Sequence, residues 1–192
     1  MNRFALCLTA AIAIAVPGTS VAETAAELPG AVAAFQRVCL AGGVDPAAPA
    51  AKLAAAGGVK DADVTIDVPA LAISRTISKN YDFSKPTAVE QWSGTVDGHV
   101  AKFVIASFPE KRRYPHLCAL VIDNAAASAL PYADDVKAAF KAFGIGTKST
   151  NLVHYFEYAG KVGVDNHPVR GEIFTRSQAS GAEKSMHIYV AY

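Results

Sequence analysis

Two strand-like segments joined by a two-residue turn constrain the fold of this chain more than any other feature. Residues 92–96 and 99–108 are rich in apolar, β-branched and aromatic residues, and Asp97-Gly98 between them is a preferred sequence for a type I′ turn. If these two residues form the turn, Trp92 faces Phe103 across the strands, and this aromatic pair fixes the register. The sequence therefore predicts an antiparallel β-hairpin here.

Further strands are expected along the chain. Four more segments have strand-like composition, and their short connections favour antiparallel pairing. They are residues 117–122, 152–158, 173–177 and 184–192. Residues 159–171 are expected to form a loop. Residues 59–89 are harder to interpret, although alternating apolar residues at 64–68 favour another strand there.

Three segments have helical character. They are residues 29–41, 45–56 and 131–143. The third is amphipathic, because Val136, Phe140 and Phe143 lie on one side, and Gly144 is expected to end it. The first two are rich in alanine and have thin apolar faces, so they need a larger surface to pack against.

These elements predict an α+β fold with two layers. About six strands form a mainly antiparallel sheet, and the amphipathic helix and the two N-terminal alanine-rich helices cover one of its faces. The segments 92–143 and 152–192 are both rich in strands and could be related units, although no residue-level repeat connects them.

The first 22 residues have the organisation of a secretory signal peptide. Arg3 provides a short positive region, residues 4–16 are uncharged and mostly apolar, and small residues at 20–22 precede a cleavage position. A membrane anchor is the alternative, but a bilayer core requires about 20 apolar residues. We therefore expect leader cleavage, a single exported domain over residues 23–192, and a periplasmic or extracellular location.

Two cysteines, Cys39 and Cys118, remain after removal of the leader, which contains Cys7. An even pair in an oxidising compartment favours a disulfide, which would stabilise the fold by roughly 4 to 5 kcal/mol at most. Two buried free thiols are the alternative. A catalytic redox pair is not indicated, since such pairs usually have C-x-x-C spacing. The predicted disulfide joins the first helix to the strand at 117–122.

The chain is close to electrically neutral. The full sequence has 18 Lys and Arg residues against 17 Asp and Glu residues, and loss of Arg3 with the leader would leave equal numbers. Nucleic-acid binding is therefore not expected, because it requires a basic surface. After the leader no apolar run is long enough for a transmembrane helix.

No motif commits the chain to a reaction. The nucleophile motifs G-x-S-x-G and S-x-x-K are absent, and the five histidines lack the spacing of a zinc site. These histidines are His99, His116, His154, His167 and His187. We therefore expect no metal and no cofactor, and we assign no catalytic residue.

Two groups of residues are candidates for binding. Arg112 and Arg113 form a local concentration of positive charge that could contact a phosphate, a lipid headgroup or an acidic partner; a solvated loop is the alternative. The aromatic residues of the C-terminal strands exceed what one covered face requires, with core packing as the alternative. The candidates for an open sheet face are His154, Tyr158, His187 and Tyr189.

Three functions are compatible with these features. The first is an exported, non-enzymatic binding protein for a protein, a glycan or a small apolar ligand. The second is an accessory or inhibitor-like subunit of a cell-envelope complex, which would recognise its partner through a strand edge or the basic loop. The third is an envelope hydrolase whose residues converge only in space. The absence of catalytic motifs favours the first function.

Overall fold

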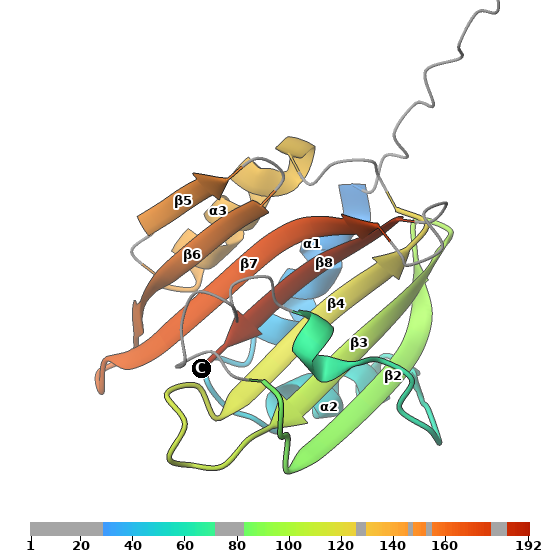
Figure 1. The fold of residues 1–192 in the computed structure, drawn as a ribbon, viewed down its shortest axis with the longest axis horizontal. Coiled ribbons are helices and arrows are strands. Elements are labelled where there is room, and N and C mark those ends of the chain that lie inside the picture. The colour runs from blue at the N-terminus through green and yellow to red at the C-terminus, as the bar shows by residue number, and fades with distance from the viewer. Residues whose placement is uncertain (1–28, 72–82, 126–129, 146–147, 153–154, 178–183) are drawn as a thin grey trace, which may run out of the picture.

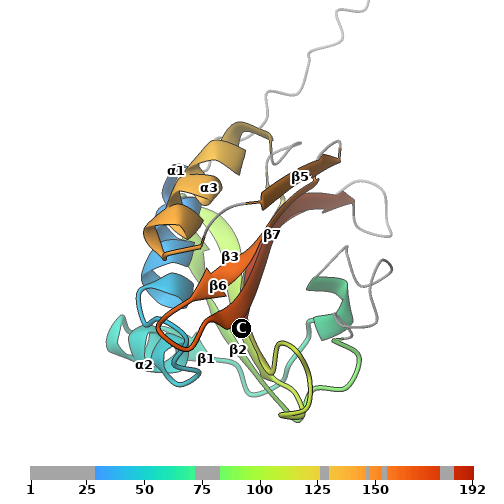
Figure 2. The ribbon, with the colours of Figure 1, turned by 90° about the vertical axis from the view of Figure 1, so that its left-hand side faces the viewer.

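A computed structural model of the chain describes residues 29–71, 83–125, 130–145, 148–152, 155–177 and 184–192. In this part of the chain, eight strands form one sheet in which every neighbouring pair is antiparallel (Figure 1). Helices cover one face of this sheet (Figure 2). The α+β class with an antiparallel sheet is therefore confirmed, with more strands than the six expected.

The elements have the following bounds. The helical elements are α1 (Pro29–Phe35), the π-helical turn η1 (Gln36–Leu40), α2 (Ala48–Ala55), the 3-10 helix η2 (Val68–Leu71) and α3 (Ala133–Ala142). The strands are β1 (Val59–Lys60), β2 (Ala88–Val96), β3 (His99–Ser107), β4 (His116–Asp123), β5 (Lys148–Leu152), β6 (Tyr155–Val162), β7 (His167–Ser177) and β8 (Lys184–Ala191).

The strand order β1-β2-β3-β4-β8-β7-β6-β5 divides the sheet into two meanders of four strands. α1 precedes the first meander and α3 precedes the second, while the last strands of the two meanders, β4 and β8, pair at the centre. Trp92 on β2 and Phe156 on β6 occupy equivalent positions, each two strands away from the central pair Leu120–Ile188. These two meanders differ in their bounds from the segments 92–143 and 152–192 compared in the sequence, because β1 belongs to the first meander and α3 lies between the two.

The β2–β3 hairpin has the predicted register. Trp92 pairs with Phe103, and both turn residues have positive φ, 49° at Asp97 and 80° at Gly98, as a type I′ turn requires. The Asp97 carboxylate also accepts a hydrogen bond of 2.7 Å from the N–H of Gly30. The hairpin turn therefore satisfies a backbone donor that the first turn of α1 leaves without an intrahelical partner.

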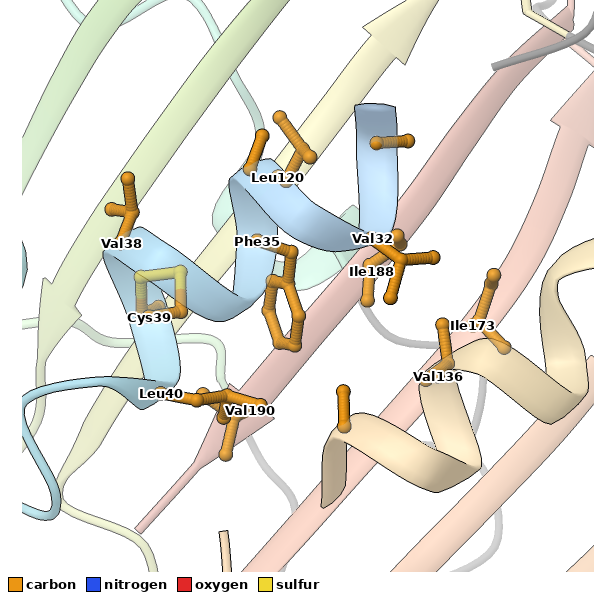
Figure 3. Packing of buried hydrophobic residues seen from close by; sticks show 14 of the residues in the cluster. Val32, Phe35, Val38, Cys39, Leu40, Leu120, Val136, Ile173, Ile188 and Val190 are labelled. Carbon is orange, nitrogen blue, oxygen red and sulfur yellow. A yellow bond between two sulfur atoms is a disulfide. The ribbon is translucent and has the colours of Figure 1, made fainter. Parts of the chain in front are cut away.

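The main core lies between the helices and the sheet (Figure 3). Phe35 and Leu40 on α1–η1 pack on this face of the sheet and are nearly inaccessible to solvent. A disulfide joins Cys39 on η1 to Cys118 on β4, with the two Cα atoms 5.5 Å apart. The predicted disulfide is therefore present, and it connects the helical layer to a central strand.

The third helix packs its predicted apolar face against the second meander. The Phe140 ring lies 6.0 Å from the Phe35 ring and 5.2 Å from the Tyr158 ring, measured between centroids. A Cβ atom at Gly171 on β7 would lie only 2.0 Å from Phe140, so glycine allows this close approach. Gly144, with φ of 94°, ends the helix as expected.

A segment crosses the opposite face of the sheet, which we call the outer face (Figure 2). This crossing segment, residues 61–71, contains η2. At one end the buried Gln91 side chain of β2 accepts a 3.2 Å hydrogen bond from the N–H of Ile66. At the other end Arg176 of β7 donates a 3.0 Å hydrogen bond to the carbonyl of Ala70. The crossing segment therefore extends from β2 to β7.

The crossing segment covers a second apolar cluster. Val68 and Leu71 pack there with Phe83 and with outward-facing residues of β3, β4, β7 and β8. The central strands are therefore buried on both faces, and the outer face is not the open aromatic surface that the sequence suggested. The two-layer prediction is therefore incomplete. Helices pack on one face of the sheet, and the crossing segment with Phe83 covers part of the outer face.

Two expectations about local structure are wrong. Residues 64–68 form no β-ladder, because the backbone N–H groups of Thr65 and Ile66 bond to the side chain of Gln91. Residues 159–171 are not a loop: they contain the end of β6, a tight turn and the start of β7. The extra strands are β1, which has two residues, and β5. The leader, residues 1–22, lies outside the described residues and stays a prediction.

Candidate binding site on the helical face

Two adjoining hollows lie between α1–η1 and α3, on the side of the helices that faces away from the sheet. Their volumes are about 440 Å³ and 130 Å³, and they share Gln36, Ala139 and Ala142. Together they form one shallow groove, which we call the α1–α3 groove; Figure 2 shows the two helices side by side. It is lined by Val32, Ala33, Gln36, Leu40, Ala41, Asp135, Ala138, Ala139, Ala142 and Phe143.

The alanine content of the two helices creates this groove. On α3 the larger apolar residues Val136 and Phe140 are buried against the sheet, while Ala138 and Ala142 are exposed. On α1 the corresponding exposed position is Ala33. Small side chains on the outward sides of two neighbouring helices leave a depression that longer side chains would fill.

The π-helical turn also shapes the groove. A π-helix has a wider turn than an α-helix, and such turns are often found at functional sites. Here η1 brings three consecutive residues, Val38, Cys39 and Leu40, into buried positions, while Gln36 at its start remains exposed in the groove. The disulfide at Cys39 holds this turn against β4.

The smaller hollow has a mostly apolar lining, whereas almost half of the exposed lining of the larger hollow is polar. Gln36 belongs to both hollows and so lies at their junction, whereas Asp135 lines only the larger hollow. Gln36 offers an amide donor and acceptor, and Asp135 offers a carboxylate. No histidine, serine or cysteine is found among the described residues that line the groove. The arrangement can bind an apolar molecule and orient a polar or cationic end.

Tyr158 does not lie on the outer face, as the sequence had suggested. Its ring stacks on Phe140 beneath α3, and its hydroxyl donates a 2.7 Å hydrogen bond to the carbonyl of Ala133 at the start of α3. Burial raises the pKa of the phenol, and the charge of Asp134 raises it further. Tyr158 is thus a core residue that positions the helix, and its expected place on an open face is corrected.

His187 and Tyr189 do face the outer side, but both are buried. Their exposed fractions are 6% and 0%. The His187 ring stacks on Phe174 with 4.8 Å between centroids, and its Nε2 lies 2.8 Å from Ser185 Oγ. Burial and, to a smaller degree, the charge of Arg176 lower the His187 pKa to about 4. Its Nδ1 has no hydrogen-bond partner within the described residues.

The Ser185–His187 pair has the atoms of a catalytic serine–histidine dyad but not its properties. A general base works best when its pKa lies near the operating pH and when a third group orients the imidazole. Here the pKa is too low, Nδ1 lacks such a group among the described residues, and both side chains are buried. The pair therefore gives no support to a hydrolase.

The two arginines lie in the loop between β3 and β4. Arg113 is exposed, with its guanidinium carbon 5.5 Å from the centre of the Tyr114 ring, whereas Arg112 is half-buried. This loop joins strands inside the sheet, so it is not at a sheet edge. His154 lies outside the described residues. The structure thus separates the sequence candidates instead of bringing them together.

Several polar residues of structural importance were missed at the sequence level. Arg170 forms ion pairs with Glu157 and Glu172, and Glu172 is fully buried. Alternation of these charges with Val169, Gly171 and Ile173 would have indicated a strand with one polar face, had the segment not been interpreted as a loop. The groove alanines carried no signal, because alanine is common on any helix surface.

No protein-family model, no curated protein and no solved structure matches this chain. Within the described residues, no group of three or more His, Cys, Asp or Glu side chains is arranged to hold a metal ion. None of the described helices is both long and apolar enough to cross a bilayer.

Proposed function

We propose that the protein is exported and binds a small apolar ligand with a positively charged end, without catalysing a reaction. The α1–α3 groove is the observation that carries this proposal. The volume of the larger hollow, about 440 Å³, falls within the range of small-molecule sites, and the adjoining smaller hollow offers a mostly apolar lining. The N-terminal leader pattern and the disulfide support export.

The charged residue in the lining of the groove indicates the sign of the ligand's charge. Asp135 is exposed and lines the larger hollow. Among the described residues, no Lys or Arg side chain lines either hollow. An anionic ligand would therefore meet like charge, whereas a cationic end would be attracted to this end of the groove.

Binding of two amphiphiles that differ only in the sign of the headgroup charge tests the proposal. Dodecyltrimethylammonium and dodecanoate, both below their micelle concentrations, would be titrated into residues 23–192 by calorimetry. The cation should bind more tightly, and D135N should remove the preference. D134N is the matched control, since Asp134 occupies the same first turn of α3 but does not line the groove.

A second pair of variants tests the location. A138Q/A142Q places two neutral, helix-compatible side chains in the groove and should weaken binding of the cation at least about tenfold. A51Q/A54Q makes the same change at exposed positions of α2 and should have no effect. Saturable binding that survives A138Q/A142Q would contradict the groove as the site, and absence of saturable binding would contradict the proposed ligand class.

A further inference from the structure

The loop between β3 and β4, residues 109–115, has a fixed conformation. At its base the N–H of Phe108 donates a 2.7 Å hydrogen bond to the carbonyl of Pro115. Within it the N–H of Arg112 donates a 2.8 Å hydrogen bond to the carbonyl of Pro109. The prolines restrict φ at both ends. The loop therefore presents its side chains from a backbone that needs little ordering.

An aromatic anchor orients one of the cations in this loop. Tyr114 is buried, with 3% of its surface exposed, and belongs to the apolar cluster of the outer face. The Arg113 guanidinium lies 5.5 Å from the centre of its ring, within the range of a cation–π interaction. Because the guanidinium is already held, less side-chain entropy is lost when it binds an anion.

A second segment brings another cation to the same end of the sheet. Phe83 packs on Phe108 with 5.3 Å between ring centroids, and the N–H of Thr87 donates a 2.7 Å hydrogen bond to the carbonyl of Ser107. Lys85 lies between these two contacts and is exposed. Figure 1 shows the segment leading into β2 beside the β3–β4 loop, near the C-terminus.

The end of the sheet therefore carries a cationic rim, which we define as Lys85, Lys111 and Arg113. All three side chains are exposed. Within residues 83–87 and 109–115, Glu110 is the single acidic residue. This local excess of positive charge contrasts with the near-neutral chain as a whole.

We propose that the cationic rim binds phosphate groups, either in a soluble phosphate ester or in the headgroup of an anionic lipid. A phosphate group can carry up to two negative charges and presents several acceptor oxygens, so it can contact several cations at once, whereas a single carboxylate has one charge and two oxygens. The forked donors of Arg113 suit such an acceptor, and Lys85 and Lys111 add point charges. This site is separate from the α1–α3 groove and does not depend on the ligand proposed there.

Titration with inorganic pyrophosphate, followed by calorimetry at low ionic strength, tests the site. Each cation near an anionic group contributes about 1 kcal/mol, so K111Q/R113Q should weaken binding about 30-fold. K137Q/K141Q removes the same net charge from exposed positions of α3 and should change the affinity less than about threefold. Circular dichroism should show that both double variants remain folded.

Vesicle binding distinguishes the two sources of phosphate. If the natural ligand is a lipid headgroup, vesicles with about 30% phosphatidylglycerol should retain the protein, phosphatidylcholine vesicles should not, and K111Q/R113Q should abolish retention. If only pyrophosphate binds, the ligand is a soluble ester. The proposal is overturned if neither binds, if K137Q/K141Q has the same effect as K111Q/R113Q, or if the dicarboxylate malonate binds as tightly as pyrophosphate.

Discussion

The buried imidazole of His187 should make the stability of the protein depend on pH. Its pKa lies at about 4 in the folded protein, against 6.5 for the free side chain, because burial and Arg176 both disfavour the imidazolium. Between these two values the unfolded chain binds a proton that the folded protein does not. The free energy of unfolding should therefore rise with pH through this window and reach its full value above about pH 6.5.

The change in the free energy of unfolding can be calculated from the lowered pKa of His187. A difference of 2.5 pKa units between 6.5 and about 4 corresponds to about 3 kcal/mol in total. Most of this, about 2.5 kcal/mol, should be lost between about pH 7.5 and about pH 4.5. That is a large part of the 5 to 15 kcal/mol by which native proteins are typically stable.

Urea unfolding of wild type and H187Q across this pH range would measure the effect. H187Q keeps polar atoms that can reach Ser185 Oγ but cannot become charged. The carboxylates of Asp61 and Glu90, whose pKa values are lowered by hydrogen bonds and, at Glu90, by Lys60, also weaken the fold in acid. They are present in both proteins, so the difference between the two isolates His187.

The difference in unfolding free energy between wild type and H187Q should therefore change by about 2.5 kcal/mol from about pH 7.5 to about pH 4.5. The matched control is H167Q, which makes the same substitution at an exposed histidine at the start of β7. A constant difference for H187Q would refute the reasoning. It would mean that solvent reaches the imidazole, so that its pKa is near 6.5.

Three further outcomes are expected. Replacing Cys118 by Ser should lower stability by about 2 to 5 kcal/mol in non-reducing urea unfolding, and dithiothreitol should then have no further effect, because the bond to Cys39 is already absent. G171A should lower the free energy of unfolding by about 1 to 3 kcal/mol, because the added Cβ meets the Phe140 ring. The double variant G171A/F140L should have a higher melting temperature than G171A alone. If it does not, the strain does not arise from this contact. D97A should lower the melting temperature by more than D97N, because asparagine tolerates positive φ and can still accept the hydrogen bond from the Gly30 N–H. Equal decreases in the two variants would show that this hydrogen bond does not stabilise α1.

Sequence patterns predicted an element correctly where residues close together in the sequence determine its structure. The β2–β3 register followed from Asp97-Gly98 and from the pairing of Trp92 with Phe103, which are close in sequence. α3 was predictable from the apolar residues along one side of the helix and from the glycine after its last turn. In such elements, propensity and tertiary packing favour the same conformation, so that sequence patterns are reliable.

Strands rich in glycine, proline or polar residues were not predictable in this way. The sequence predicts a loop over residues 159–171, yet Gly160 and Pro168 within this segment lie in the β6–β7 ladder. Pro168 is tolerated because the β7–β8 pairing begins only at Arg170, so β8 does not need the missing N–H. β5 lacks apolar alternation and lies at the sheet edge, so its position depends on β6 and not on its own composition.

The candidate sites depend on tertiary structure to different degrees. Arg113 was recognisable from the charge of its loop, but Lys85 reaches the same rim only through the packing of Phe83 on Phe108. The α1–α3 groove requires that two helices about 100 residues apart lie side by side, which no local pattern encodes. His187 and Tyr189 were assigned to an exposed surface because the sequence did not indicate a crossing segment.

The central β4–β8 pair has a consequence for the order of folding. β8 is the last strand in the sequence but lies in the middle of the sheet, so a chain that emerges from its N-terminus can assemble the first meander while the β4 edge is still unpaired. Such an edge can pair with other chains and aggregate. Both partners of the disulfide, Cys39 and Cys118, belong to the part that emerges first. Oxidation can therefore hold α1–η1 against β4 and stabilise the half-formed protein until β8 arrives to cover that edge.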